Sequence, residues 1–196
     1  AFYGCSNLAD VSFSGMTIGE IGKGAFSGCG SLTSLNINDV ATIGSMGEAA
    51  FAWSGLRSTG LDKVVGLSSI PESAYNGCSA LTDTGLGGNT SITSIGVDAF
   101  KNCSRLATSG LESNTTIKTL GEGCFSGANM SGGLSLPLYS KIEELPSRAF
   151  YGSKLETVYL GCDHAVLINS TTFPKQYMTV MVPAKMISKY SKGDPK

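Results

Sequence analysis

The chain has 196 residues, of which 41% are hydrophobic and only 15% are charged, and its net charge is −1. This composition supports a packed core and argues against a disordered chain. Because no basic excess is present to neutralise phosphate groups, it also argues against nucleic acid as a partner and against electrostatic docking on an anionic membrane. No apolar run approaches the roughly 20 residues of a membrane-spanning helix, so no direct membrane insertion is predicted for this segment.

A small residue followed by an aromatic residue recurs along the chain. The interval between successive pairs is 24 or 25 residues, and such a fixed period is the signature of a repeat architecture. The pairs are Ala1-Phe2, Ala25-Phe26, Ala50-Phe51, Ala74-Tyr75, Ala99-Phe100, Cys124-Phe125 and Ala149-Phe150.

Two apolar columns precede these pairs, seven and four residues before the small residue. They consist of Ile18, Ile43, Leu67, Ile92, Ile117 and Ile142, and of Ile21, Met46, Ile70, Ile95, Leu120 and Leu145. After the pair, four repeats read Cys-x-x-Leu, as in Cys29 to Leu32, and the other three lack the cysteine and are one residue shorter. The next segment follows L-x-x-L-x-L in the best repeats, and this period of two predicts a half-buried strand. Repeats three to five have a small residue at the middle apolar position, so thinner or irregular strands are expected there.

These patterns predict a repeat solenoid of the leucine-rich type, mainly β with short helical or 3-10 turns and one curved parallel sheet. Residues 1–160 are assigned to seven repeats, the first of them truncated, and residues 161–196 to a degenerate repeat and a C-terminal cap. The aromatic column is predicted to lie in the core. Irregular stacking is expected in repeat three, which carries Trp53, and in repeat six, which carries Cys124 and the extra pair Gly132-Gly133.

The composite Ile-x-x-Ile-Gly-x-x-Ala-Phe-x-Gly-Cys-x-x-Leu closely resembles the BspA-type leucine-rich repeat of bacterial and protozoan cell-surface proteins. Ile18 to Leu32 and Ile92 to Leu106 carry this pattern, and Val182-Pro183-Ala184 followed by Tyr190 resembles the segment that ends such arrays. The resemblance implies an extracellular or cell-surface location, with a signal peptide outside this segment. It also implies adhesion to host proteins or to other cells.

The six cysteines are open to two interpretations. Cys5, Cys29, Cys78 and Cys103 share one repeat column, so disulfides between Cys5 and Cys29 or between Cys78 and Cys103 are geometrically conceivable. The reduced state is favoured, because a free cysteine beside a core behaves as a small hydrophobic residue. All four are therefore expected to be buried and unpaired.

No constellation of catalytic or metal-binding residues is evident. His164, the only histidine, is expected to be a solvated loop residue without a nucleophile motif, and zinc would need a Cys-x-x-Cys pair or further histidines. Glu143 and Glu144 are expected to line an exposed turn. The sequence thus predicts no enzyme activity, no metal and no cofactor. Five Asn-x-Ser/Thr sequences, relevant only in a eukaryotic source, begin at Asn89, Asn102, Asn114, Asn129 and Asn169.

The leading functional hypothesis is a non-catalytic, adhesin-like surface module that binds a protein or glycan on host or neighbouring cells through the outward face of its sheet. The residues predicted to carry this contact are Ser34, Asn36, Asp83, Thr108, Thr157 and Tyr159. Trp53 is, with Tyr159, one of the two aromatic residues that the repeat does not explain, so either is open to a contact role; for Trp53 a partly buried packing role is favoured. The alternatives are a purely structural stalk or spacer within a longer surface protein and, with less support, a β-helix enzyme acting on polysaccharide.

Overall fold

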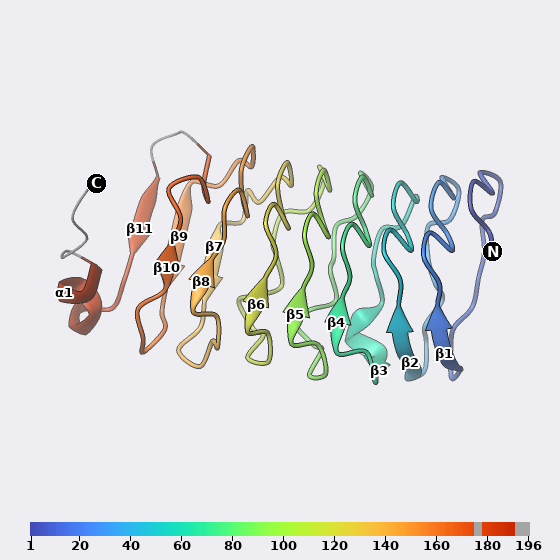
Figure 1. Ribbon diagram of the computed structural model, residues 1–196, viewed down its shortest axis with the longest axis horizontal. Helices are drawn as coiled ribbons and strands as arrows, with labels where there is room; N and C mark the ends of the chain where they lie inside the picture. The colour runs from blue at the N-terminus through green and yellow to red at the C-terminus, as the bar shows by residue number, and fades with distance from the viewer. Residues whose placement is uncertain (175–177, 191–196) are drawn as a thin grey trace.

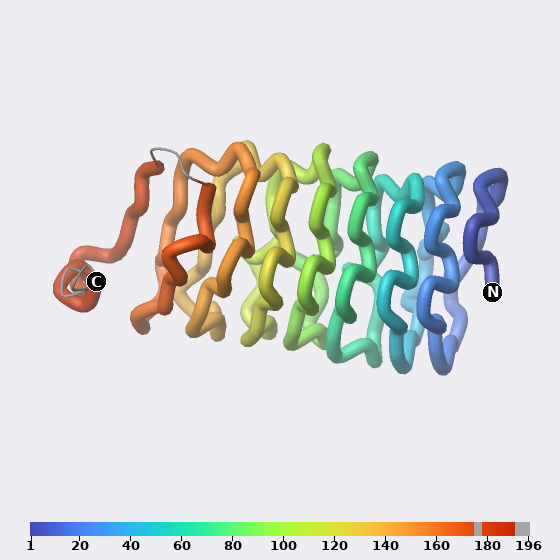
Figure 2. Tube along the Cα trace, turned by 45° about the horizontal axis from the view of Figure 1, so that its top comes forward, coloured from blue at the N-terminus to red at the C-terminus, as the bar shows by residue number. Residues whose placement is uncertain are grey.

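The chain forms a row of stacked coils, one for each repeat. The computed structural model describes residues 1–174 and 178–190. Figures 1 and 2 show the coils side by side along the long axis, in chain order from the N-terminus, with little curvature in either view. The predicted leucine-rich-repeat solenoid, with little helix, is confirmed.

The apolar columns before each aromatic pair form short parallel strands along one side of the solenoid (Figure 1). Successive coils place these strands in register, so that Ile18 lies opposite Ile43 and Ile70 lies opposite Ile95. The strands are β1 (Thr17–Ile21), β2 (Ala41–Met46), β4 (Ser69–Ile70), β5 (Ser94–Ile95), β6 (Thr119–Leu120), β8 (Glu144–Leu145) and β10 (Leu167–Ile168).

The L-x-x-L-x-L segments form a second parallel ladder on another side of the coils. It contains β7 (Leu134–Leu136), β9 (Thr157–Leu160) and β11 (Thr179–Met181), and earlier coils contribute the isolated bridges Asp10–Ser34 and Ser58–Asp83. The prediction of one curved sheet is therefore wrong. The strands divide into four short sheets, β1-β2-β3, β4-β5-β6, β10-β8 and β11-β9-β7, where β3 is Val64–Val65.

Backbone conformation explains why the second ladder is interrupted in repeats three to five. Gly60, Gly85 and Gly110 have φ values of 69°, 65° and 80°, in the left-handed region that turns the chain out of an extended path. After Gly60 the chain makes a short 3-10 helix, Leu61–Lys63. In repeat two, Asn36 has a φ of 47° and turns the chain out of an extended path after the isolated bridge at Ser34.

Buried polar ladders replace strand hydrogen bonds in these middle coils. The Thr59 Oγ1 donates to the Thr84 carbonyl at 2.6 Å, and the Thr84 Oγ1 donates to the Ser109 carbonyl at 2.9 Å. Asn89 and Asn114 are also buried, and both donate from Nδ2 to carbonyls of the preceding coil. These two asparagines are therefore closed to glycosylation in the folded chain.

The aromatic column is a continuous stack through the core. Neighbouring rings from Phe2 to Phe173 lie 5.3 to 5.9 Å apart between centroids and are nearly parallel. Stacking is regular at repeats three and six, contrary to expectation, because the departures at Trp53 and Gly132 lie outside the ring positions. Burial is incomplete at the two ends of the stack: Phe2 is 43% exposed, since a coil stacks on only one of its sides in this structure, and Phe173 is half-buried.

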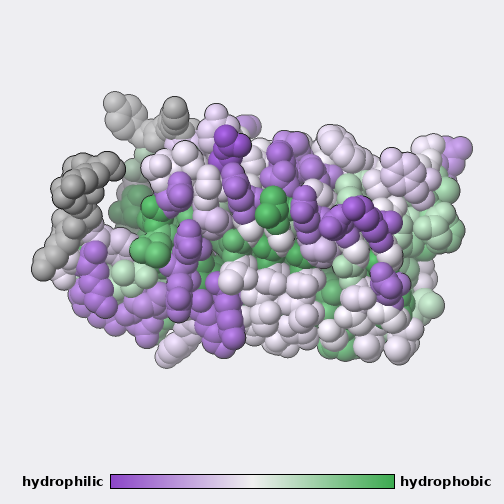
Figure 3. Space-filling model, viewed as in Figure 1, coloured by the Kyte–Doolittle hydropathy of each residue, from purple (hydrophilic) through white to green (hydrophobic). Residues whose placement is uncertain are grey.

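The last coil and the short helices close the C-terminal end. Phe173 stacks on Phe150, and the hydroxyl of Tyr190 accepts a hydrogen bond from the Val166 amide at 2.9 Å. Tyr190 ends α1 (Ile187–Tyr190), which follows the 3-10 helix Ala184–Met186 and its buried Met186. Residues 175–177 and 191–196 of the predicted cap lie outside the described residues. Figure 3 shows hydrophobic surface near this end, where Leu167 and Ile168 are exposed.

Candidate functional site

All six predicted contact residues lie on the side of the solenoid formed by the L-x-x-L-x-L segments. Five are exposed and Asn36 is half-buried. The structure brings three of them together, because Ser34, Asn36 and Asp83 line one hollow of about 270 Å³ with Ser58 and Lys63 among its neighbours. The other three, Thr108, Thr157 and Tyr159, lie outside this hollow on later coils.

Ser34, Asn36 and Asp83 already form hydrogen bonds within the fold. The Ser34 hydroxyl accepts from the Asn36 amide at 2.9 Å, and the Asn36 Nδ2 donates to the Val11 carbonyl at 2.9 Å. Asp83 accepts from the Gly85 amide at 2.9 Å and from the Ser58 hydroxyl at 3.2 Å. Replacing Asp83 with alanine would therefore disturb the coil as well as the surface.

Tyr159, in contrast, is not held by the fold through its hydroxyl. Its ring is 42% exposed and lies against Gly161, where an added Cβ would be 2.6 Å from the ring. In the ladder its neighbours are Ser135 on β7 and Met181 on β11. Within the described part of the chain, no side-chain hydrogen bond engages Tyr159, Thr157 or Thr108, so these three are available for contact with a ligand.

Trp53 is more exposed than the partly buried packing role expected from sequence. Its side chain is 62% exposed and lines a second hollow of about 380 Å³ together with Arg57 and Arg105. The sequence signal that marks it is its position, because Gly28, Gly77, Gly127 and Gly152 occupy the equivalent place in other coils.

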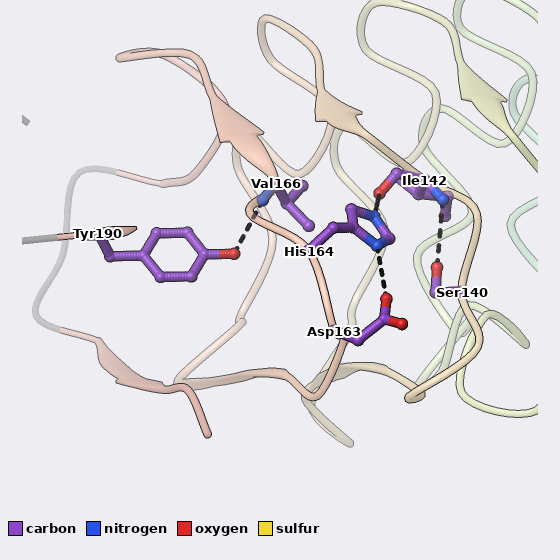
Figure 4. A network of polar contacts seen from close by, with 6 residues as sticks. All are labelled: Ser140, Ile142, Asp163, His164, Val166 and Tyr190. Atoms are coloured by element: carbon purple, nitrogen blue, oxygen red, sulfur yellow. Dashed lines mark hydrogen bonds and ion pairs between the residues drawn. The ribbon is translucent and has the colours of Figure 1, made fainter. Parts of the chain in front are cut away.

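His164 is also better ordered than a solvated loop residue. Figure 4 shows the ring between Asp163 and the Ile142 carbonyl; Nδ1 is 3.1 Å from Asp163 Oδ1, and Nε2 is 2.9 Å from the carbonyl oxygen. Both ring nitrogens thus face acceptors, and only the protonated imidazole donates to both. The pKa of His164 is accordingly raised, first by the bond to the Ile142 carbonyl and then by Asp163 and the nearby Glu143.

We expect this contact to make stability depend on pH. Because the His164 pKa is raised on folding, the stabilisation that its protonated ring provides is fully present below the pKa of unfolded histidine, about 6.5. This stabilisation is lost as the pH rises through the pKa that His164 has in the folded protein. The pKa of Asp163 is lowered, chiefly by its hydrogen bond to His164. Its ionised carboxylate therefore stabilises the fold at pH values above the ordinary pKa of aspartate, and this stabilisation is lost as the pH falls through the lowered pKa. Measured by urea unfolding, the free energy of unfolding of the wild type should decline from pH 6 to pH 8, and that of His164→Gln should not show this decline. Equal slopes in both proteins would contradict the prediction.

The cysteine column is explained by hydrogen bonding between coils. The thiols of Cys29, Cys78 and Cys103 donate to the carbonyls of Phe2, Phe51 and Tyr75 in the preceding coils at 3.1, 3.1 and 3.3 Å. Burial is also the main cause that raises the pKa of each of these thiols. All six cysteines are free thiols in the structure, and five of them are buried. Cys5 is exposed, so the expectation that the whole column is buried is wrong for the first coil.

Thiol titration should reflect this difference. In the native protein only Cys5 should react with an aromatic disulfide reagent, because a thiolate must be both formed and accessible to react. The other five thiols should react after denaturation without reductant. A second fast-reacting thiol in the native protein, or fewer than six after denaturation, would contradict the assignment.

Two further hollows carry charged residues but no recognisable reaction centre. One of about 710 Å³ is lined by Lys118, Lys141, Glu143, Glu144 and His164, and Glu143 and Glu144 are exposed there as expected. The other, of about 690 Å³, lies beside the Lys101–Asp98 ion pair. Among residues 1–174 and 178–190, no three His, Cys, Asp or Glu side chains are grouped to hold a metal ion. No helix in these ranges is long and apolar enough to cross a membrane.

Comparison with known proteins agrees with this architecture. A family model described as the BspA type leucine-rich repeat region matches in six copies, over residues 1–131 and 45–179. No curated protein gives a significant match. A solved leucine-rich repeat protein from Bacteroides ovatus is similar in fold, with a TM-score of 0.54 and 21% identity. The alignment covers 93% of this chain and 51% of that one, so this chain spans about half its length. The chain belongs to the BspA-type leucine-rich repeat family.

Proposed function

We propose that this protein is a non-catalytic interaction module of an exported, cell-surface protein, and that it binds a protein or glycan through the outward face around β9. The observation that carries the proposal is the position of Tyr159. It stands exposed between Ser135 and Met181, next to Thr157, on a side of the solenoid whose backbone is held rigid by neighbouring coils.

The chemistry of this row supports a binding role. Tyrosine is enriched among the residues that dominate binding energy at interfaces, and methionine is enriched at interfaces in general. Because the hydroxyl of Tyr159 and the side chain of Thr157 have no partner within the described residues, a ligand can engage them without breaking an internal hydrogen bond. A rigid scaffold also lowers the entropic cost of binding.

A binding screen against extracellular-matrix proteins and a glycan panel tests the proposal. For any partner found, Tyr159→Ala should weaken binding by about 10-fold or more, as expected for an interface hot spot. The melting temperature should change little. Tyr151→Ala is the matched control, because Tyr151 is similarly exposed but lies on the turn after the Phe150 anchor.

The alternative of a stalk or spacer predicts a different outcome. If no protein or glycan in the screen binds at micromolar concentration, the outward face is only scaffold. If a partner binds but tolerates Tyr159→Ala, the contact lies elsewhere on the coils.

A further inference from the structure

Trp53 occupies a backbone conformation that is unfavourable for its side chain. Its φ of 58° is in the left-handed region, and the equivalent residues Gly28, Gly77 and Gly127 have φ values of 76°, 75° and 70°. For a bulky residue such a φ is an outlier with an energetic cost. Asn102 has the same conformation at the equivalent position of its coil, with a φ of 60°, but asparagine tolerates this conformation better than tryptophan does. Glycine would therefore satisfy the fold at position 53 at lower cost.

The indole lies against the next coil at Gly77 and is largely open to solvent. A Cβ placed on Gly77 would lie 2.5 Å from two atoms of the ring, so the indole covers the Gly77 backbone closely. The side chain is nevertheless 62% exposed. The result is a fixed aromatic surface that faces solvent.

Two guanidinium groups share the hollow with this ring. Arg57 and Arg105 are both exposed, and neither forms a side-chain hydrogen bond or ion pair with any residue in the described ranges. No acidic residue lines the hollow. Its remaining lining is small or short-chained: Gly30, Thr33, Ser54, Gly55, Gly77, Ser79 and Ala80.

We propose that this hollow binds an anionic saccharide, with a sugar ring against Trp53 and its carboxylate or sulfate group on Arg57 and Arg105. This names a ligand class and a second site for the proposed binding function, on which it rests. A pyranose offers a flat C–H face to an aromatic ring and hydroxyl groups to a floor of backbone and hydroxyl groups. Arginine pairs with carboxylate in a bidentate geometry, and unpaired guanidinium groups retain that capacity.

Trp53 is the only tryptophan of the chain, so its fluorescence reports on this hollow alone. Tetragalacturonic acid and a sulfated chondroitin tetrasaccharide separate the two sources of charge, and a neutral galactose tetramer and tetraglutamate are the controls. We expect saturable changes in emission with at least one anionic saccharide, weakening as salt is raised. Equal binding of the neutral sugar or of tetraglutamate would overturn the proposal, as would no response to either anionic saccharide.

Variants assign the contacts. Arg57→Gln and Arg105→Gln should each weaken binding by about 10-fold or more, since each removes a charge-assisted hydrogen bond. Arg148→Gln, on a different hollow, should bind normally. Trp53→Gly, measured by calorimetry, should lose binding while melting near the wild-type temperature, because five other coils have glycine at this position. Normal affinity in Trp53→Gly would refute the site.

The Tyr159 face provides the means to separate this proposal from the proposed function. Saccharide binding that survives Tyr159→Ala belongs to the Trp53 hollow. If the protein binds a partner through Tyr159 but does not bind anionic saccharides, the proposed function is retained and the saccharide site at Trp53 is rejected.

Discussion

Replacing Phe100 with alanine is expected to lower the free energy of unfolding by about 3–5 kcal/mol. The Phe100 ring is fully buried and stacks on Tyr75 and Phe125, with centroids 5.3 Å away on each side. Alanine would leave a cavity that the coils close only partly, because backbone bonds such as Phe100 N to Cys124 O, at 2.8 Å, hold their spacing. Urea unfolding monitored by circular dichroism measures the loss.

Two other rings of the same stack are controls. Phe2→Ala should lower the free energy of unfolding clearly less than Phe100→Ala does, because Phe2 is 43% exposed and stacks on one side only. Tyr75→Phe should stabilise the protein by about 1 kcal/mol, since the buried Tyr75 hydroxyl has no hydrogen-bond partner in the described ranges. Equal costs for Phe100→Ala and Phe2→Ala would show that the stack does not carry the stability assigned to it.

The repeating part of the structure was predictable because each coil must solve the same packing problem. Ile70 and Ile95 recur 25 residues apart and meet in register, and the aromatic rings do the same. The cysteine column was likewise recognisable as structural. The pattern did not specify which segments of neighbouring coils form backbone hydrogen bonds with each other. For this reason the sequence did not predict that the segments before each aromatic pair form most of the parallel strands.

Non-repeating residues were harder to place, for physical reasons. The conformations of Asn36 and Trp53 depend on a left-handed φ, which no apolar periodicity encodes. The ordering of His164 depends on a carbonyl 22 residues away, which composition cannot indicate. The segments of repeats three to five around Gly60, Gly85 and Gly110 were recognised as irregular, but the ladder of hydroxyl groups within them follows only from the stacking of successive coils.

Replacing Asn114 with alanine is expected to destabilise the protein about as much as removing one buried ring of the aromatic stack. Its Nδ2 donates to the carbonyls of Leu86 at 2.7 Å and of Asn89 at 3.0 Å, and its Oδ1 accepts from the amides of Thr116 and Ile117 at 2.9 Å each. Alanine would leave the Thr116 and Ile117 amides and the Asn89 carbonyl without partners in a largely buried place, while the Leu86 carbonyl keeps its bond from the Asn89 amide at 3.1 Å. The free energy of unfolding should fall by about 3 kcal/mol or more, since each buried polar group left unsatisfied costs about 1–3 kcal/mol. Urea unfolding at pH 7 measures this loss.

Asn114→Asp separates the two halves of this network. The carboxylate keeps the acceptor for the Thr116 and Ile117 amides but turns a charged oxygen toward two carbonyl oxygens, so at pH 7 it should cost at least as much as alanine. Acid should relieve part of the cost, because a protonated carboxyl donates one hydrogen bond. Asn38→Ala is the control: Asn38 is exposed, and its side chain has no hydrogen bond among the described residues, so the change should stay within about 0.5 kcal/mol. If Asn114→Ala were as mild as Asn38→Ala, water would be satisfying the coil interior in place of the amide, and the polar ladder would be a consequence of stacking rather than a cause of it.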